Sequence, residues 1–341
     1  MPPKPKVVAF CPVAFQLALP LALLLASVFP ALSSAQQPVE SVGARALGMG
    51  GAFVAVANDA SATHWNPAGL VTAGPAGVTI GWADFRTGNQ TGDPVVGLGR
   101  RHAYFSSLGT LPVGLSLTRT SDARITDVTG ARARATTLAT TQYGVSLLQS
   151  VVKGLVIGAN LKLVRGTVSE AVGSGLSADA LLGGDDDRLT MTSHRSTSFD
   201  CDLSAMADFD KVRVGVLWKN LRQPGFTNVE GIATHLKRAA RAGVSVLPTS
   251  GLTLALDMDL DTVDLWDGPR RMLAVGGEQR LTTRLVVRAG ARWNRAAEVR
   301  GPVYTAGASI NLKKSLWFDT HATYGDISRD RGVGAALRAG F

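Results

Sequence analysis

From residue 77 to the end of the chain, apolar and polar side chains alternate along one segment after another. The final segment places one apolar set on a single face: Val333, Ala335, Leu337, Ala339 and Phe341. Successive side chains of a β-strand point to opposite faces. Alternation over about eight or more residues therefore predicts strands whose two faces meet different solvents.

About fourteen strands are predicted from this alternation, at 77–84, 99–107, 111–119, 136–149, 154–165, 197–208, 211–219, 235–247, 251–261, 270–280, 284–294, 302–312, 315–324 and 332–341. Their length is close to the ~9–11 residues of a tilted membrane-spanning strand and exceeds the ~5–6 residues typical of soluble sheets. We expect one face of each strand to meet lipid.

The connections between these strands alternate in length. The segments 85–98, 120–135, 166–196 and 220–234 are long, and the turns between them are tight. Long loops on one rim and tight periplasmic turns on the other are typical of outer-membrane barrels. A soluble β-sandwich also alternates, but it has no reason to sort its loops in this way. The sequence thus predicts an all-β fold, a transmembrane antiparallel β-barrel over residues 77–341.

The composition agrees with a barrel in lipid. The chain is 45% hydrophobic and only 18% charged, whereas a soluble domain is about one quarter charged. Lipid offers no water to backbone groups, so a sheet within it must close on itself. The net charge of +9 is spread along the chain rather than clustered, which argues against a nucleic-acid partner.

The amino terminus is typical of an export signal. Lys4 and Lys6 precede an apolar stretch over 13–29, and small residues at 33–35 offer a cleavage point. We expect residues 1–35 to form a cleavable signal peptide, with an uncleaved anchor as the alternative. Cleavage would leave Cys201 as a single cysteine without an intrachain disulfide.

Residues 36–76 do not alternate and are rich in Gly and Ala. The turn at Asn66, Pro67, Ala68 and Gly69 combines a fixed φ with a permissive glycine. The glycines at 48, 50 and 51 lack the preceding strand and downstream acid of a dinucleotide-binding motif. Small residues of this kind allow a chain to pack in a confined space.

Three stretches resemble the amino-terminal signature of the FadL-like outer-membrane proteins: 43–53, 58–62 and 65–70. The resemblance is closest to the PorV/PorQ and UPF0164 branch, some members of which carry the name TraF-like, and 216–226 resembles the same branch. It implies a barrel of fourteen strands with residues 36–76 inside as a hatch. The hatch motif would comprise Gly48, Gly50, Gly51, Asn66, Pro67 and Ala68.

No catalytic or metal motif is present in the sequence, and we expect neither enzyme activity nor a cofactor. The five histidines are scattered without paired spacing, and one cysteine cannot make a zinc site. Asp319 and His321 share a strand face, but an ordinary hydrogen-bonded pair in a polar lumen is the favoured interpretation. The acidic run 185–187 lacks the spacing of a calcium loop, and we interpret it as a solvated loop tip.

Charged side chains are predicted on the lumen face of three strands: Asp257, Asp259, Asp261, Arg284, Arg288, Arg292, Asp319 and His321. The acidic and basic columns lie on strands two apart, with Arg271 and Glu278 on the strand between them. The favoured interpretation is mutual neutralisation inside the barrel. The alternative is that these charges hold the hatch or line a polar path.

The resemblance implies two functions. The first is passive transport of hydrophobic small molecules through a hatch-gated lumen, and the second is a PorV-like role in type IX protein secretion. A structural or adhesive barrel is a further alternative. The expected partners are outer-membrane lipid and a hydrophobic ligand or secreted proteins. The alternating strand that ends at Phe341 also resembles the signal read by the outer-membrane assembly machinery.

Overall fold

The computed structural model describes residues 39–88, 96–183, 187–229, 231, 233–265, 268–297, 301–326 and 330–341. The predicted signal peptide lies outside these residues, as do Asp185 and Asp186 of the acidic run. No helix in the described ranges has both the length and the apolar character needed to cross a membrane.

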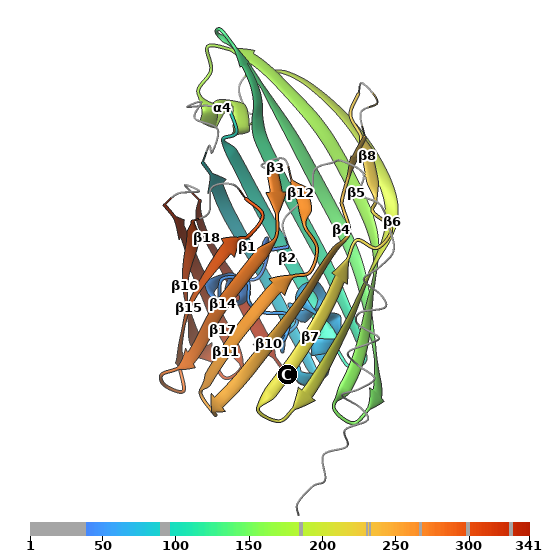
Figure 1. Ribbon diagram of the computed structural model, residues 1–341, viewed down its shortest axis with the longest axis vertical. Coiled ribbons are helices and arrows are strands. Elements are labelled where there is room, and N and C mark those ends of the chain that lie inside the picture. Colours follow the sequence, from blue (N-terminus) through green and yellow to red (C-terminus); the bar gives the residue numbers. More distant parts are fainter. Residues whose placement is uncertain are drawn as a thin grey trace, which may run out of the picture. The chain divides into compact units, whose positions relative to one another are not determined.

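The described residues form a closed antiparallel barrel of fourteen strands (Figure 1). β1 (Ala76–Thr87) pairs with both β2 (Gly99–Thr110) and β18 (Arg331–Gly340), so the sheet closes on itself. The other strands are β3 (Val113–Thr129), β4 (Arg132–Val152), β5 (Leu155–Ser174), β6 (Thr190–Phe209), β7 (Val212–Lys219), β10 (Ala239–Thr249), β11 (Leu252–Asp259), β14 (Met272–Arg280), β15 (Leu285–Asn294), β16 (Pro302–Lys313) and β17 (Leu316–Gly325). The predicted fold class and strand number are confirmed.

The alternation predicted from sequence orients the strands as expected. Large apolar side chains point outward and are exposed, among them Ile80, Leu117, Ile157, Leu161, Leu163, Leu254, Leu256, Val333 and Leu337. Their neighbours in sequence point inward and are buried, as Asp257 and Lys162 are. An apolar outer face with a polar inner face is the arrangement of a barrel in lipid.

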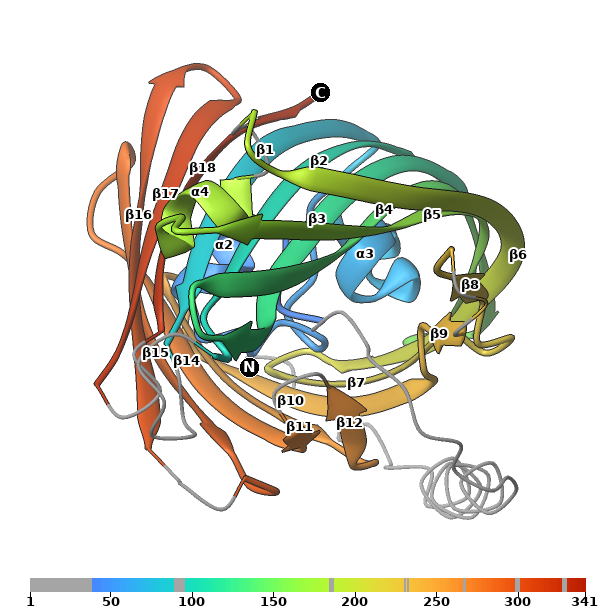
Figure 2. The same cartoon turned by 90° about the horizontal axis from the view of Figure 1, so that it is seen from above.

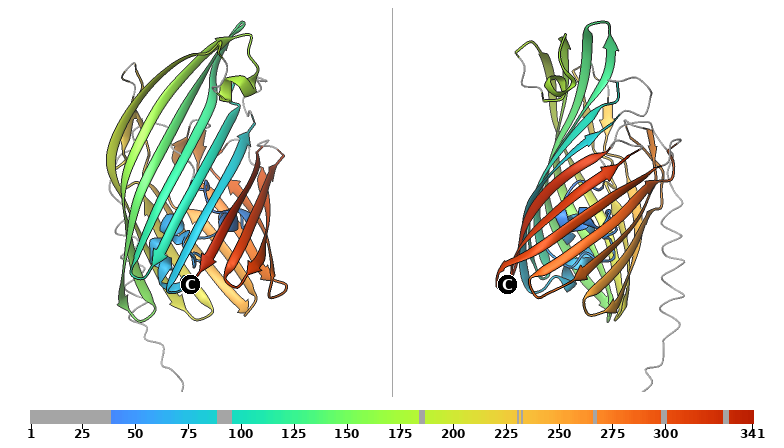
Figure 3. Two further views of the ribbon diagram at one scale, coloured as in Figure 1. Left: turned by 180° about the vertical axis from the view of Figure 1, so that it is seen from behind. Right: turned by 90° about the vertical axis from the view of Figure 1, so that its left-hand side faces the viewer.

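Four consecutive strands are much longer than predicted. β3 to β6 run for 17, 21, 20 and 20 residues, and together they rise above the other strands as a one-sided wall (Figure 3). The predicted long loop 120–135 is wrong, because β3 and β4 pair through it to a turn at Gly130. The predicted loop 166–196 shrinks to 175–189 and holds α4 (Ala178–Gly183). The outward-facing residues of these extensions are mostly polar, so the extensions lack the apolar outer face that marked the other strands.

Two short hairpins occupy connections between barrel strands. One pairs β8 (Gly225–Thr227) with β9 (Ala233–His235), and the other pairs β12 (Val263–Leu265) with β13 (Gly268–Arg270). Phe226 in β8 packs against Leu138, Val164 and Val168 of the wall. The hairpin therefore covers an apolar patch on the inner side of the wall.

Residues 39–75, here called the inner segment, lie inside the barrel (Figure 2). They contain α2 (Ala44–Gly48), α3 (Ala62–Trp65) and the 3-10 helix η1 (Pro67–Thr72). Phe53 and Trp65 are fully buried with ring centroids 5.9 Å apart, and the Trp65 indole donates to Val42 O at 3.1 Å. The core of this protein thus lies where the inner segment packs against the inner face of the barrel.

Candidate functional site

Glycines on the inner face of the barrel let the backbone of the inner segment lie directly against the strands. A Cβ atom added at Gly276 of β14 would come within 2.2 Å of Met49 O, and one at Gly290 of β15 within 2.4 Å of Gly50 N. Gly50 and Gly51 themselves have positive φ of 72° and 86°, which only glycine adopts at low cost. Backbone therefore meets backbone over this part of the lumen.

The remaining motif residues fix the end of the inner segment to β6. Asn66 Nδ2 donates to Val54 O at 2.8 Å, and its Oδ1 accepts from Ala68 N as the cap of η1. Pro67 begins η1, where its fixed φ suits a first helical residue. Ala68 N also donates to Ser204 Oγ at 3.1 Å. Gly48 O accepts from Thr305 Oγ1 at 3.0 Å.

A buried ionic network ties α2 to β14 and β15. Arg45 forms two hydrogen bonds with the carboxylate of Glu278, at 2.7 and 2.8 Å, and pairs with Asp59 at 2.9 Å. Arg288 Nε donates to the same Glu278 carboxylate at 2.6 Å. Glu278 therefore joins a cation of the inner segment, Arg45, to a cation of the barrel, Arg288.

Glu40 anchors the start of the inner segment in the same way. Its buried carboxylate pairs with Arg241 of β10 and with Arg270, and Arg241 also pairs with Asp259 at 2.6 Å. Burial raises the pKa of Glu40, but the two guanidinium groups outweigh it and hold that pKa below its ordinary value. The carboxylate therefore stays ionised at neutral pH.

Asp257 of β11 accepts hydrogen bonds from the backbone N–H groups of Phe53 and Val54, both at 2.8 Å. Of the other residues in the two predicted charge columns, some are buried in the lumen and some lie outside it. Asp261 follows the end of β11, and Arg284 is exposed in the turn before β15, away from the lumen contacts. Arg288 and Arg292 are buried.

We expect Asp257→Ala to lower the free energy of unfolding by at least ~1–3 kcal/mol, because it leaves two buried N–H groups of the inner segment without an acceptor. Thermal unfolding in detergent measures the change. Asp261→Ala is the matched control, since it removes a carboxylate of the same predicted column from a position beyond the end of the strand. Equal unfolding of the two variants would contradict the role of Asp257.

Asp319 and His321 of β17 are both buried but are not partners of each other. Asp319 accepts from Ser309 Oγ and from Arg338 Nε, the latter at 3.0 Å. Among the described residues, no hydrogen bond reaches either ring nitrogen of His321. The pair thus lacks the contact that an acid–base pair requires.

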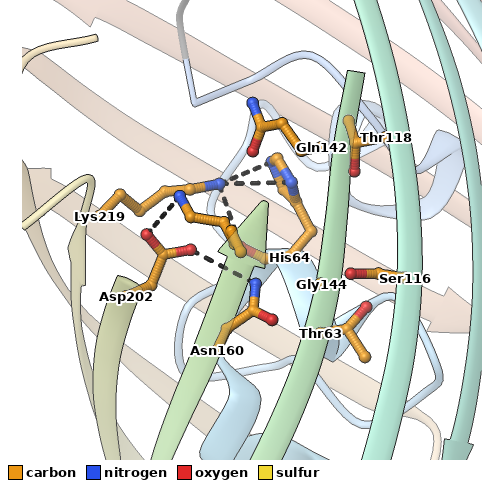
Figure 4. Close-up of a pocket in the computed structure, with 10 residues that line it drawn as sticks. Thr63, His64, Ser116, Thr118, Gln142, Gly144, Asn160, Asp202 and Lys219 are labelled. Carbon is orange, nitrogen blue, oxygen red and sulfur yellow. Dashed lines mark hydrogen bonds and ion pairs between the residues drawn. The ribbon is translucent and has the colours of Figure 1, made fainter. Parts of the chain in front are cut away.

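A small polar pocket of about 10 Å³ lies between the inner segment and the barrel strands (Figure 4). Lys162 of β5 pairs there with Asp200 at 2.8 Å and with Asp202 at 2.7 Å. Lys219 of β7 lies beside His64, with Nζ 3.3 Å from Nδ1. A volume of about 10 Å³ is close to the ~10–15 Å³ that one water molecule needs, so this polar pocket suits water rather than a hydrophobic molecule.

His64 is a neutral link in this pocket. Burial, followed by the Lys219 ammonium, holds the pKa of His64 well below its usual range. His64 Nε2 lies 3.1 Å from Val39 O, and Lys219 Nζ lies 3.1 Å from Nε2 and 3.3 Å from Nδ1 and donates to His64 O at 3.3 Å. Lys219 thus ties β7 to the inner segment.

Sequence reasoning missed several residues of this lumen: Glu40, Arg45, Asp59, His64, Lys162, Asp200, Asp202, Lys219 and Arg241. The alternation of β5 already places Lys162 inward, and the same parity in β6 places Asp200 and Asp202 inward. No sequence signal pairs these strands with the charges of the inner segment. Among the described residues, no group of three His, Cys, Asp or Glu side chains is arranged to hold a metal ion.

The barrel has known structural relatives. The family model for the F plasmid transfer operon protein TraF matches residues 99–259. The toluene transporter TbuX of Ralstonia pickettii has a TM-score of 0.62 at 12% identity, covering 88% of this chain and 98% of that one. The CymD monoaromatic hydrocarbon channel has a TM-score of 0.60 at 14% identity, covering 89% and 98%.

A Pseudomonas aeruginosa FadL homologue has a TM-score of 0.57 at 13% identity, covering 90% of this chain and 98% of that one. No curated protein sequence matches the chain. At these identities the likeness concerns the fold, which is that of the FadL-like outer-membrane barrels. Membership of the PorV/PorQ branch stays a prediction.

Proposed function

We propose that this protein is an outer-membrane channel of a Gram-negative bacterium through which small hydrophobic molecules diffuse. The observation that carries this proposal is the inner segment, which fills the lumen of a closed fourteen-strand barrel. Structures with the same fold are named as toluene transporters and as a monoaromatic hydrocarbon channel. An enzymatic role has no support, because Asp319 is engaged by Ser309 and Arg338 rather than by His321.

In this proposal residues 36–76, which include the inner segment, act as a hatch. Its anchors are ion pairs and hydrogen bonds to barrel residues such as Glu278 and Asp257. Non-covalent contacts of this kind can break and re-form while the barrel stays closed. A ligand that binds the displaced state better would shift the population toward an open lumen.

Uptake of radiolabelled toluene by bacterial cells with and without this protein in their outer membrane tests the function. We expect a several-fold faster initial uptake in cells that contain the protein. In liposomes, arabinose should enter no faster with the protein than without it, because the inner segment blocks a polar path. Equal toluene uptake in the two strains would contradict the transport proposal.

A second candidate function is a PorV-like role in type IX secretion, which the one-sided wall favours. β3 to β6 extend well past the other strands and offer an extended surface to exported proteins. Affinity capture should then recover secreted proteins that share a carboxy-terminal domain. If capture yields none of these proteins while toluene uptake is accelerated, the secretion role is wrong.

Phe341 lies at the seam where the barrel closes, and we propose that it serves the assembly machinery. Its side chain is 75% exposed, and its N–H donates to Ala76 O at 2.9 Å beside the β1–β18 pair. An exposed aromatic terminus on the closing strand is accessible to a partner protein.

A further inference from the structure

The outward face of β3 to β6 changes from apolar to basic between two adjacent rows of residues. The strand register places four exposed apolar or aromatic side chains in one row: Leu117, Tyr143, Leu163 and Phe199. The next row toward the long ends of the strands contains Arg119, Thr141, Arg165 and Thr197. Aromatic side chains mark the level at which a barrel leaves the hydrocarbon. The two arginines therefore lie at the level of the lipid headgroups.

Two further arginines lie beside this row. Arg195 of β6 is one row higher, opposite Thr167 of β5, and its Nε donates to Thr167 Oγ1 at 3.4 Å. Arg222 follows β7, and its guanidinium carbon lies 5.7 Å from the centre of the Phe199 ring. Arg119 and Arg165 are separated by one strand, which sets their backbones about 10 Å apart. All four arginines are exposed, and together they form a basic patch.

No acid of the described chain balances this basic patch. The outward positions of the three rows that run from Leu117 to Arg195 contain no Asp or Glu, and no described carboxylate pairs with any of the four arginines. The acids of the same strands point inward, where Asp122 pairs with Arg101 and Asp200 with Lys162. Cations that gather without a counter-charge attract anions, so the patch suits an anion from outside the chain.

The wall continues this outward face above the basic patch. The row above Arg195 contains small and hydroxyl side chains: Ala123, Thr137, Ser169 and Ser193. Hydroxyl groups both donate and accept hydrogen bonds, as sugar rings do. The other barrel strands end lower (Figure 3), so this side of the barrel offers the taller polar surface to a large headgroup.

We propose that the basic patch binds the phosphate groups of a glycolipid in the outer leaflet, with the acyl chains of that lipid against the apolar row that begins at Leu117. A guanidinium donates two parallel hydrogen bonds to phosphate and stays charged. A lipid is favoured over an acidic protein because the patch adjoins the face that meets hydrocarbon, so one molecule with an anionic head and apolar chains matches both rows. This inference rests on the proposed function only in that the barrel spans an outer membrane with its long strands outward.

Native mass spectrometry of the detergent-solubilised full chain, titrated with diphosphorylated lipid A, tests the site without any transport step. We expect the Arg119→Gln/Arg165→Gln variant to bind about 25-fold more weakly than wild type, because each basic side chain at a lipid surface contributes about fivefold. Arg284→Gln/Lys313→Gln is the matched control, since it removes two exposed cations from the opposite rim. The control should bind like wild type.

Three further measurements distinguish a lipid site from other anion sites and from arginines that only stabilise the fold. Lipid A without its phosphates should bind wild type and the Arg119→Gln/Arg165→Gln variant equally weakly. Neither inorganic phosphate nor a polyglutamate peptide, at the concentration of the lipid, should displace diphosphorylated lipid A, because neither has acyl chains. The ligand-free variant should melt at the wild-type temperature, because both arginines are exposed and unpaired.

Equal binding of lipid A by wild type and the Arg119→Gln/Arg165→Gln variant would overturn the proposal, and so would an equal loss in the control or a lack of binding to wild type. Displacement by inorganic phosphate would show a general anion site, and displacement by polyglutamate would show a surface for an acidic protein; either result overturns the assignment to a lipid. A marked fall in the melting temperature of the variant would show a structural role instead. Lipid A binding without accelerated toluene uptake would leave this site standing and contradict the transport proposal alone.

Discussion

Replacement of Glu278 by glutamine is expected to lower the free energy of unfolding by about 3–5 kcal/mol, the usual cost of removing one partner from a buried ion pair. Glu278 bonds to Arg45 and Arg288 together, so the change leaves two buried guanidinium groups short of a negative charge. Arg45 keeps Asp59 and Arg288 keeps Ser309. The barrel should therefore still form, with a loosened inner segment.

Equilibrium unfolding by urea in detergent micelles measures this change. Asp208→Asn is the control, because Asp208 pairs with Arg213 at 2.8 Å but is about one third exposed. A partly exposed pair of this kind contributes ~0–1 kcal/mol, so its loss should be small. A fall of similar size in both variants would show that Glu278 is not a special anchor.

Gly276→Ala is expected to open the lumen several-fold while leaving the barrel intact. The new methyl group would lie 2.2 Å from Met49 O and 2.8 Å from Met49 Cβ, well inside van der Waals contact. β14 is held by hydrogen bonds to strands on both sides, so the inner segment is the part that moves. Overpacking of this kind costs roughly 1–3 kcal/mol, enough to shift the equilibrium of a hatch.

Conductance across a planar bilayer and cleavage of the inner segment by added protease both report on this opening. Gly277→Ala is the matched control, since its methyl group points outward, with Leu254 Cδ2 at 3.3 Å as the nearest atom. The two variants add the same group at adjacent positions on opposite faces. If Gly276→Ala conducts no more than Gly277→Ala, the inner segment does not gate the lumen.

Much of the barrel could be predicted from sequence because lipid imposes a strict pattern. Where one face meets hydrocarbon, residues such as Leu254 and Leu256 must alternate with polar neighbours, and the strand is visible. The upper parts of β3 to β6 escape this constraint. Thr190 to Thr197 of β6 is largely exposed and is polar except for Met191. Its sequence therefore predicts a loop, although its backbone pairs fully with β5.

The sequence predicted the lumen site only in part. Parity along a strand predicts that Asp257 and Arg288 face inward, but it does not give their partners. Those partners come from the inner segment: Phe53 and Val54 for Asp257, and Arg45 for the carboxylate that Arg288 shares. Parity also misplaces strand ends, which is why Arg284 faces solvent rather than lumen.

The contacts of the inner segment also govern the order in which the protein is assembled. Arg45 meets Glu278 across 233 residues of chain, Phe53 meets Asp257 across 204, and Gly48 meets Thr305 across 257. The segment emerges early from the ribosome, yet these three partners lie on β14, β11 and β16, which are made late. These three contacts therefore cannot form until β11 to β16 have been made. Contacts this distant slow folding, so closure of the β1–β18 seam and seating of the inner segment should be one late, shared step.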